Sequence, residues 1–342
     1  MEYFSPSDFL YVVSPMPVID VRSPSEFAAG HIADAINIPL LKDEERAIVG
    51  TIYKHKGKQP AIDKGMEFVE PKMTILAQEA QKVAKDGKVG LYCWRGGMRS
   101  NRTAWWFEEN GIQCSVLEGG YKAFRNEALA SFESLDTLLV IDGPTGSGKT
   151  DILHALKKVG EQVLDLEGMA NHRGSVFGNI GLGKQPSSQQ FQNDLFQQTR
   201  SFDLKKRIWI EREGMNIGKV YLPQSLWTRM TASSAIAIEV SQDLRVERLV
   251  NDYGSASNAD LEMGIRKLQQ RLGGQHMKAA LELLDTNRLA EVAALLLNYY
   301  DKRYAFSKKK YLDRKPFTIE LKSNDAAENA KLMIALANKH KL

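Results

Sequence analysis

The segment LLVIDGPTGSGKT, residues 138–150, places the strongest constraint on how this chain can fold. Its apolar, β-favouring run ends at Asp142, and the residues that follow match the pattern G-x-x-x-x-G-K-[ST]. Ile152, Leu153 and Leu156 then recur at helical spacing. A strand, a glycine-rich loop and a helix in this order let backbone N–H groups surround a phosphate at a helix N-terminus. The sequence therefore predicts a P-loop.

The predicted loop assigns phosphate-binding roles to several side chains and backbone groups. Lys149 would neutralise the phosphates and is a candidate catalytic residue, and the Thr150 hydroxyl would hold a Mg²⁺ ion. Arg173, in a later loop that should face the same site, is a candidate anion clamp. The complete predicted phosphate-binding set is Gly143, Gly146, Ser147, Gly148, Lys149, Thr150 and Arg173.

Beyond the P-loop, apolar runs alternate with segments of helical period. The runs that favour strands are 162–166, 208–211, 236–240 and 317–321, with mostly helical sequence between 261 and 304. This order predicts a doubly wound P-loop fold of the NTPase or kinase kind with a helical insertion. Acids follow two of these strands, so Thr150, Asp165 and Glu211 are candidate metal ligands. The choice among Asp165, Glu211 and Glu213 stays open, because any one of them can be a solvated strand end.

Three further segments of this half carry weaker signals. His172 lies beside Arg173, but a loop histidine is more often structural than catalytic. Residues 178–190 are rich in Gly, Ser and Gln, which is typical of a mobile substrate loop. The basic runs 205–207 and 308–310 are by default solvated surface. The second run would bind unpaired bases if the aromatic residues beside it stack on them; these are Tyr304, Phe306 and Tyr311.

The N-terminal half also alternates between strands and helices. Strands are expected at 16–20, 35–39, 88–92 and 114–117, and helices at 73–85 and 101–110. This pattern predicts a small parallel α/β sheet. A stretch of low apolar content, 126–136, is predicted to be the linker between the two halves.

The chemistry of the N-terminal half centres on Cys93, which follows a predicted buried strand and precedes a helix. Backbone N–H groups at such a turn and the nearby Arg99 would favour the thiolate, so both are candidate catalytic residues. Gly96 and Gly97 permit the tight turn that this arrangement requires. Cys114 lies within a β run without a nearby cation and is expected to be a buried structural cysteine.

Composition limits the remaining possibilities. A length of 342 residues suggests two domains, and 43% hydrophobic with 26% charged residues is ordinary for soluble globular protein. A net charge of +4 permits an anionic partner without requiring one. Two cysteines at unlike positions make neither a disulfide framework nor a metal cluster. No signal segment or membrane-spanning run is evident. We therefore expect a cytoplasmic protein with reduced thiols that does not associate with membranes, and we expect it to be a monomer.

Three motifs give the N-terminal half a family resemblance. DVRSPSEFAAGHI (20–32), the Cys93 loop and LEGGYKAF (117–124) together resemble a rhodanese domain over roughly the first 130 residues. In that family the cysteine carries sulfur or selenium. Here five residues separate Cys93 from Arg99, a spacing that matches rhodanese-fold phosphatases, whose wider loop fits a tetrahedral oxyanion. The resemblance thus implies a loop that would accept a phosphate-bearing chalcogen donor.

The order of the two domains extends the resemblance to nearly the whole chain. A rhodanese-like domain at 1–130, followed by a P-loop domain with a C-terminal helical region at 136–342, resembles the tRNA 2-selenouridine synthase family. DLEGMANHRGSVFG (165–178) and EREGMNIG (211–218) carry the match in the second half. The resemblance implies a transferase that replaces sulfur with selenium in wobble 2-thiouridine of tRNA. Selenophosphate would supply the selenium, and geranyl diphosphate would supply the geranyl group of an S-geranyl intermediate.

Two other classes of function stay open from the sequence. One is a nucleotide-hydrolysing P-loop enzyme with a rhodanese sulfur-relay domain, which nucleotide turnover would reveal. The other is a regulatory binding module in which neither site turns over. The intact Cys93 loop argues against the second, since degenerate rhodanese modules can dispense with the thiol.

Overall fold

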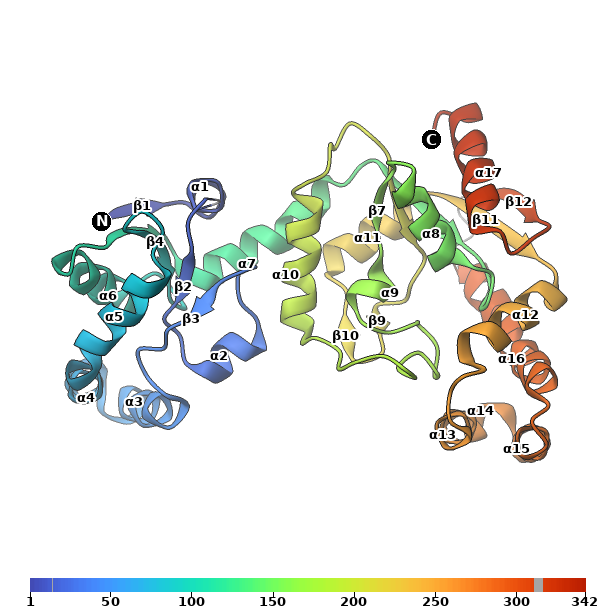
Figure 1. Ribbon diagram of the computed structural model, residues 1–342, viewed down its shortest axis with the longest axis horizontal. Coiled ribbons are helices and arrows are strands. Elements are labelled where there is room, and N and C mark those ends of the chain that lie inside the picture. The colour runs from blue at the N-terminus through green and yellow to red at the C-terminus, as the bar shows by residue number, and fades with distance from the viewer. Residues whose placement is uncertain (14, 311–315) are drawn as a thin grey trace. The chain divides into compact units, whose positions relative to one another are not determined.

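The chain forms two units, and one helical segment from the second half of the sequence belongs to the first unit (Figure 1). A computed structural model describes residues 1–13, 15–310 and 316–342. The first unit comprises Met1–Ser131 and Ser187–Gln197, and the second comprises Phe132–Pro186 and Gln198–Leu342. The chain therefore leaves the second unit to add a helical segment to the first and then returns.

The first unit is built on a five-stranded parallel sheet in the order β1-β5-β4-β2-β3. The strands are β1 (Glu2–Phe4), β2 (Val18–Asp20), β3 (Ile36–Asn37), β4 (Lys88–Tyr92) and β5 (Gln113–Leu117). Four of the five residues of β4 are buried, which explains why this segment is a continuous apolar run. The prediction of a parallel α/β sheet in this half is confirmed.

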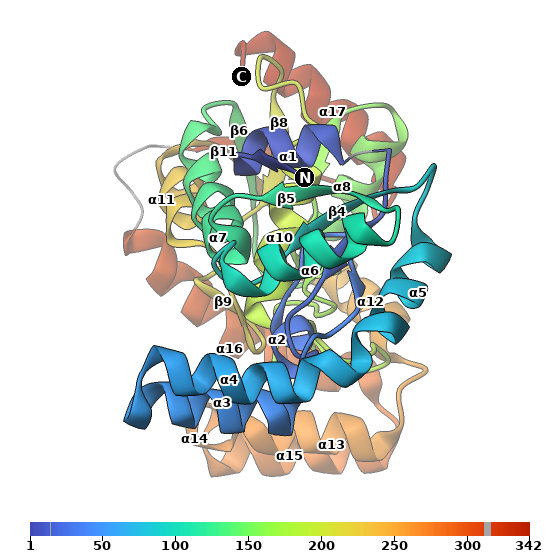
Figure 2. The same cartoon turned by 90° about the vertical axis from the view of Figure 1, so that its left-hand side faces the viewer.

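Helices connect and cover these strands, and several of them were not expected from the sequence. The helices are α1 (Pro6–Val12), α2 (Pro24–Ala29), α3 (Asp43–Lys56), α4 (Lys58–Val69), α5 (Met73–Val83), α6 (Met98–Glu109) and α7 (Gly120–Ser131), with a 3₁₀ turn η1 (Glu70–Lys72). Helices α3 and α4 lie side by side, joined at Gly57 (Figure 2). This pair occupies the segment between β3 and α5.

The boundary between the two units falls within the predicted linker at 126–136, although this segment is packed rather than open. Helix α7 continues to Ser131 and is followed by the 3₁₀ turn η2 (Phe132–Ser134). Ala128 and Phe132 have no exposed surface, and Leu135 is 2% exposed. The segment contains few apolar residues, but those it has are buried, so its low average hydropathy concealed a packed helix.

The second unit contains another five-stranded parallel sheet, in the order β12-β11-β6-β8-β7. The strands are β6 (Leu138–Asp142), β7 (Gln162–Leu164), β8 (Ile208–Glu211), β11 (Ser234–Val240) and β12 (Phe317–Leu321), and β9 (Asn216–Ile217) pairs antiparallel with β10 (Val220–Tyr221). Helices α8 (Lys149–Lys158) and α17 (Ala326–Lys339) share one apolar core with this sheet. Shorter helices are α9 (Leu166–Met169) and α11 (Gln224–Ala232).

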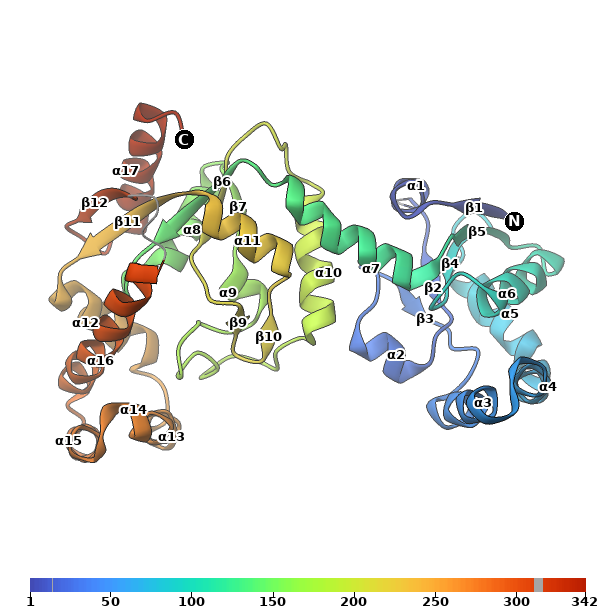
Figure 3. The ribbon, with the colours of Figure 1, turned by 180° about the vertical axis from the view of Figure 1, so that it is seen from behind.

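A helical region is inserted between β11 and β12, as predicted. It consists of α12 (Gln242–Tyr253), α13 (Asn258–Lys267), α14 (Gln269–Leu272), α15 (Gly274–Asp285) and α16 (Leu289–Lys310). Figures 1 and 3 show α13, α14 and α15 grouped away from the sheet of this unit. The region has an apolar core of its own, to which Ile265, Leu268 and Leu284 belong. None of the described helices is long and apolar enough to cross a membrane.

The helix added to the first unit is α10 (Ser188–Thr199). Phe191 and Leu195, four residues apart, are fully buried, and Phe196 packs edge-on against Phe124 at a ring-centroid distance of 5.7 Å. The prediction of a mobile loop over 178–190 is therefore wrong at its end, because residues 188–190 form the first turn of this helix. Their polar side chains made the start of an amphipathic helix look like a loop.

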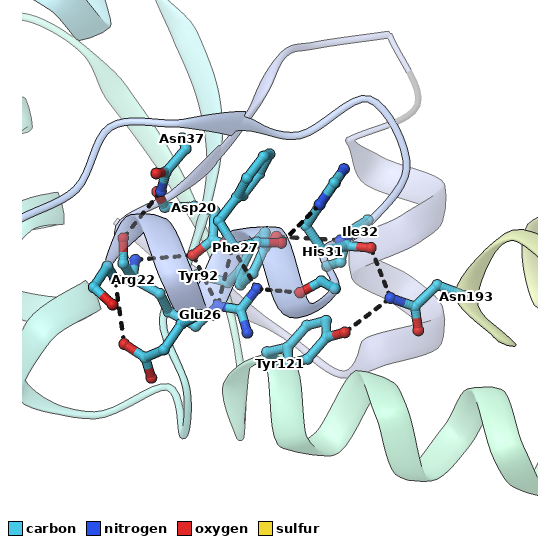
Figure 4. Close-up of polar contacts among 12 residues, drawn as sticks. Asp20, Arg22, Glu26, Phe27, His31, Ile32, Asn37, Tyr92, Tyr121 and Asn193 are labelled. Atoms are coloured by element: carbon cyan, nitrogen blue, oxygen red, sulfur yellow. Dashed lines mark hydrogen bonds and ion pairs between the residues drawn. The ribbon is translucent and has the colours of Figure 1, made fainter. Parts of the chain in front are cut away.

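Asn193 fixes α10 to the first unit through a buried polar network (Figure 4). Its amide donates to the His31 carbonyl and to the Tyr121 hydroxyl, each at 2.8 Å, and its oxygen accepts from Arg125 Nη1 at 2.7 Å. The Tyr121 ring in turn lies 3.8 Å from the guanidinium of the buried Arg22. Since every polar atom of the Asn193 amide is used, the network specifies one position for α10.

Replacing Asn193 with alanine should destabilise the folded chain by about 1–3 kcal/mol, because buried partners lose their hydrogen bonds. Urea unfolding of the full chain measures this cost. Gln189→Ala is the matched control on the same helix, since Gln189 is exposed and only its backbone carbonyl accepts from Arg125. Equal unfolding midpoints for the two variants would contradict the role assigned to Asn193.

Candidate active sites

The Cys93 site lies where β4 ends and α6 begins. Cys93 is buried, with 3% of its surface exposed, and its Sγ lies 3.3 Å from the hydroxyl of Ser100. The N-terminal end of α6 adds positive potential near the sulfur. The sequence patterns did not single out Ser100, although it lies seven positions after Cys93.

Glycines are required in and beside the Cys93 loop, because a Cβ atom at these positions would collide with neighbouring backbone atoms. Gly96 has φ +60°, and a Cβ there would lie 2.7 Å from the Gly119 nitrogen. Gly120 has φ +61°, and a Cβ there would lie 2.4 Å from the Cys93 carbonyl oxygen. The Cys93 loop and the LEGGYKAF segment are therefore packed backbone against backbone.

Arg99 has an acidic partner that the sequence did not reveal. Its Nη1 donates to Oε2 of Glu26 at 3.0 Å, and Arg46 Nε lies 3.7 Å from the same oxygen. Burial opposes ionisation of Glu26, but the hydrogen bond and charge of Arg99 outweigh it and hold the pKa of Glu26 below its ordinary value. Arg99 and Cys93 line the same cavity. Cys114, by contrast, is a structural cysteine, and burial raises the pKa of its thiol to about 12.

The P-loop site forms as predicted between β6 and α8. Gly148 caps α8 with φ +84°, and Gly146 has φ +77°. Lys149 Nζ donates to the Gly143 carbonyl at 3.1 Å. Ser147 is 2% exposed, and within the described residues its hydroxyl has no hydrogen-bond partner. These groups are the donors that a bound phosphate would meet.

Arg248, from α12, is a cation of this site that sequence reasoning missed. A Cβ at Gly148 would lie 1.4 Å from Arg248 Nη1, so the guanidinium rests directly on the P-loop. Its other nitrogen, Nη2, donates to Asn324 at 2.7 Å, and the side chain is 8% exposed. No P-loop pattern includes a helix some hundred residues later, so only the fold brings Arg248 here.

Glu167 contacts the P-loop through Thr150. Thr150 Oγ1 donates to Glu167 Oε2 at 3.1 Å, whereas Asp165 accepts from the Gly168 nitrogen and lies 2.8 Å from His154. Glu211 is fully buried and accepts from the Glu167 nitrogen at 2.8 Å. Of the three predicted metal ligands, only Thr150 lines the cavity described below. The described residues contain no cluster of three or more His, Cys, Asp or Glu side chains suited to a metal ion.

Glu213 and Glu167 form an acidic pair at the same edge of the sheet. Burial, and then the charge of Glu167, raise the pKa of Glu213 to about 8. Burial also raises the pKa of Glu167, although Lys149 opposes that rise. Behind them, burial raises the pKa of Glu211 well above its ordinary value. Anionic groups crowded in this way would be stabilised by a cation among them.

Arg173 and His172, the two residues predicted to lie beside the phosphate site, have different surroundings in the structure. Arg173 lines the cavity; its Nη1 donates to the Ile180 carbonyl at 3.0 Å, and its guanidinium lies 5.4 Å from the Tyr253 ring centroid. His172 is buried, and burial lowers its pKa. The structural interpretation of His172 fits this placement, because glycines at 178 and 218 make room for its ring.

The predicted base-stacking surface is only partly described. The Tyr304 hydroxyl donates to Asp142 at 3.2 Å, so this ring is committed to the P-loop strand, whereas Phe306 is 75% exposed. The side chains of Lys308, Lys309 and Lys310, and the whole of Tyr311, lie outside the described residues.

A cavity of about 660 Å³ in the second unit joins the P-loop to the helical region. Its polar end contains P-loop residues 143 and 145–150, with Glu167, Arg173 and Arg248. Its apolar end is lined by residues from the helices and the segment before them, among them Phe177, Leu249, Leu261, Ile265, Val292 and Leu296. The cavity is therefore amphiphilic: charged side chains of both signs line it near the P-loop, and hydrocarbon side chains of the helical region line it as well.

Comparison with known proteins agrees with this arrangement. The family model for the tRNA 2-selenouridine synthase AAA domain matches residues 136–331, and that for the rhodanese-like domain matches residues 11–127. A tRNA 2-selenouridine synthase of Shewanella frigidimarina is 33% identical over 87% of this chain and 90% of its own length. The chain belongs to the tRNA 2-selenouridine synthase family.

Other similarities accompany this family assignment. A tRNA 2-selenouridine synthase of Nitrosomonas europaea is 38% identical over 70% of this chain and 64% of its own length. Among solved structures, the N-terminal domain of a protein named as ATP/GTP binding, from Clostridium difficile 630, is 42% identical over 32% of this chain and 86% of that chain, with a TM-score of 0.31.

Replacing Glu213 with glutamine should flatten the pH dependence of stability. In the folded chain Glu213 keeps its proton up to a pKa of about 8, whereas the ordinary value is 4.5. Between these pH values the unfolded chain has lost that proton, so the free energy of unfolding should fall as pH rises and then level off. The glutamine side chain does not titrate, and that part of the fall should disappear.

Urea unfolding at several pH values, without added divalent cations, tests this difference. Glu320→Gln is the control, since Glu320 is exposed on β12 and should keep the wild-type pH dependence. Parallel curves for wild type and Glu213→Gln would contradict the raised pKa.

Proposed function

We propose that this chain is a tRNA 2-selenouridine synthase that works in two steps at two sites. The P-loop site transfers a geranyl group from geranyl diphosphate to the sulfur of wobble 2-thiouridine. The Cys93 site then exchanges the alkylated sulfur for selenium, which selenophosphate supplies. Family membership supports the overall reaction, since the relatives at 33% and 38% identity carry the name tRNA 2-selenouridine synthase.

The amphiphilic cavity of the second unit is the observation that carries the first step. A prenyl diphosphate has two anionic phosphates and a branched hydrocarbon tail. The cavity offers the P-loop with Lys149, Arg173 and Arg248, and also apolar side chains of the helical region. A nucleotide would place a polar base and ribose against Leu261, Ile265 and Leu296. This difference favours a prenyl diphosphate over ATP or GTP, and with it the transferase over the nucleotide-hydrolysing alternative.

Residues of the P-loop would stabilise the departing diphosphate. In this step the base sulfur attacks the first carbon of the geranyl group, a C–S bond forms, and the C–O bond to the diphosphate breaks. Lys149, the Ser147 hydroxyl and Arg248 lie where negative charge would increase on the leaving group. Arg173, which lines the same cavity, would hold the outer phosphate.

The oxygen ligands at the P-loop fit Mg²⁺. The Thr150 hydroxyl and the Glu167 carboxylate would hold the ion together with phosphate oxygens and water, and Glu213 is close enough to Glu167 for each to influence the other's pKa. When bound, Mg²⁺ would neutralise part of the diphosphate charge. Asp165 and Glu211 would hold Glu167 in place rather than contact the ion. Both accept hydrogen bonds from the backbone of the segment that carries Glu167.

Lys149→Ala tests the P-loop step. Loss of the cation nearest the leaving group should lower geranyl transfer about a hundredfold or more. The measurement is mass spectrometry of nucleosides from 2-thiouridine tRNA treated with the purified variant and geranyl diphosphate. Lys157→Ala, an exposed lysine near the end of the same helix, is the control and should retain activity. Undiminished S-geranyl product from Lys149→Ala would exclude this site.

Cys93→Ala tests the division of labour between the sites. Because Cys93 and Lys149 belong to different units, the variant should still make the S-geranyl nucleoside and should stop there, without 2-selenouridine. Arg99→Ala should show the same pattern more weakly. Cys114→Ala, the second buried cysteine, should keep both activities apart from a modest packing loss. Normal 2-selenouridine from Cys93→Ala would remove the thiol from the mechanism.

A further inference from the structure

The first unit contains a larger cavity than its cysteine chemistry requires. It has a volume of about 1210 Å³ and is lined by residues of the α3–α4 pair and of the segment from Cys93 to Trp106. Selenophosphate is a small, fully polar anion that the Cys93 loop alone would accommodate. Most of this cavity therefore lies beyond the space that a selenium donor would occupy.

The walls of the cavity are largely hydrocarbon. They include Leu40, Val49, Ile62, Val69, Met73 and Trp106. No residue of α3 is buried in the core, yet Val49 and Gly50 of this helix line the cavity. The helix pair thus adds an apolar wall beside the cysteine, in which Val69 belongs to the core of this unit and Val49 packs against that core. Apolar walls of this kind bind hydrocarbon and exclude ionic groups.

The rim of the same cavity is basic. Arg46, Lys58, Arg95 and Arg102 line it and are exposed, and Glu70 is the acidic residue among the lining side chains. Exposed cations around an apolar interior fit a ligand that joins a phosphate backbone to a hydrocarbon group. A tRNA whose anticodon base carries a prenyl thioether has this composition.

We propose that this cavity binds the geranyl chain of the alkylated base while Cys93 and its loop carry out the selenium step. The inference rests on the proposed function, because the base must arrive already alkylated. Over the whole step, the C–S bond at C2 of the base breaks and a C–Se bond forms. Water cleaves the Se–P bond of selenophosphate, so the products are 2-selenouridine, geranyl thiol and phosphate.

A hydrocarbon held in this cavity would act on the reaction in two ways. It anchors the base so that C2 lies next to Cys93, which lines the same cavity. It also lets the site distinguish an alkylated base from the unmodified thiocarbonyl, which lacks any group to fill the cavity. The selenium step would then be selective for the product of the P-loop step.

The first measurement uses the wild-type full chain. Anticodon stem–loop RNAs bearing S-geranyl- or S-methyl-2-thiouridine are incubated with selenophosphate, and kcat/KM is determined for each. The geranyl substrate should be preferred about tenfold or more, because a long hydrocarbon leaves water and a methyl group does not. Equal kcat/KM values would overturn the inference without any variant.

Gly65→Phe provides the matching variant. Gly65 lies on α4 and lines the cavity, and a Cβ there would meet only Val49, at 3.9 Å. The added ring should fill the cavity and lower kcat/KM for the geranyl substrate to that for the methyl substrate, so that the preference disappears. Gly65→Ala is the control and should keep the preference. Retained geranylation of 2-thiouridine RNA by both variants shows that the chain is folded.

Failure of this inference differs from failure of the proposed function. If the proposed function is wrong, the wild type converts neither alkylated RNA to 2-selenouridine. If only the cavity assignment is wrong, the wild type converts both RNAs equally fast, or Gly65→Phe keeps the geranyl preference. Loss of both substrates in Gly65→Phe, with geranylation intact, would also overturn it, since the cavity would then serve something other than the hydrocarbon.

Discussion

Both candidate sites depend on one backbone constraint, the turn that carries a buried parallel strand directly into a helix. In the first unit β4 leads through Gly96 to α6, and in the second β6 leads through Gly146 and Gly148 to α8. Positive φ at these glycines points backbone N–H groups into the turn and leaves a helix N-terminus facing the ligand. The reactive side chains, Cys93 and Lys149, are placed by this geometry.

Cations and acids lie close together at the second site. Lys149 and Arg248 lie against the P-loop, while Glu167, Glu211 and Glu213 crowd together at the ends of neighbouring strands. Burial, together with this crowding, raises the pKa of each of these acids, which is a cost to the folded protein. Such a cost is common where a site is organised for a ligand rather than for stability.

Local sequence patterns predicted the parts of this protein that are local. The P-loop, the Cys93 turn and the apolar strands follow from short motifs and periodicity, and the structure agrees with them closely. What the patterns did not reveal depended on distant packing. Arg248 approaches Gly148 only because α12 folds over the loop, and Glu167 rather than Asp165 meets Thr150 because the chain turns sharply after β7.

The position of α10 in the first unit shows more clearly that local sequence patterns do not predict distant contacts. Its polar start looked like a loop, and nothing local indicates that Asn193 completes a network with Tyr121 and Arg125 in the other half of the chain. Segment 126–136 contains the boundary between the units, but its low apolar content did not show that a few well-placed apolar residues bury part of it. In each case the deciding contact joins residues far apart in sequence.

In the proposed function, the P-loop site must act before the Cys93 site. The most direct measurement is a time course of nucleosides from 2-thiouridine tRNA treated with the wild-type chain and selenophosphate, with or without geranyl diphosphate. If the sites act in this order, S-geranyl nucleoside should rise and fall before 2-selenouridine accumulates. Omitting geranyl diphosphate should then abolish 2-selenouridine. Supplying tRNA that is already geranylated should restore it. Formation of 2-selenouridine at the full rate from 2-thiouridine tRNA without geranyl diphosphate would contradict the account.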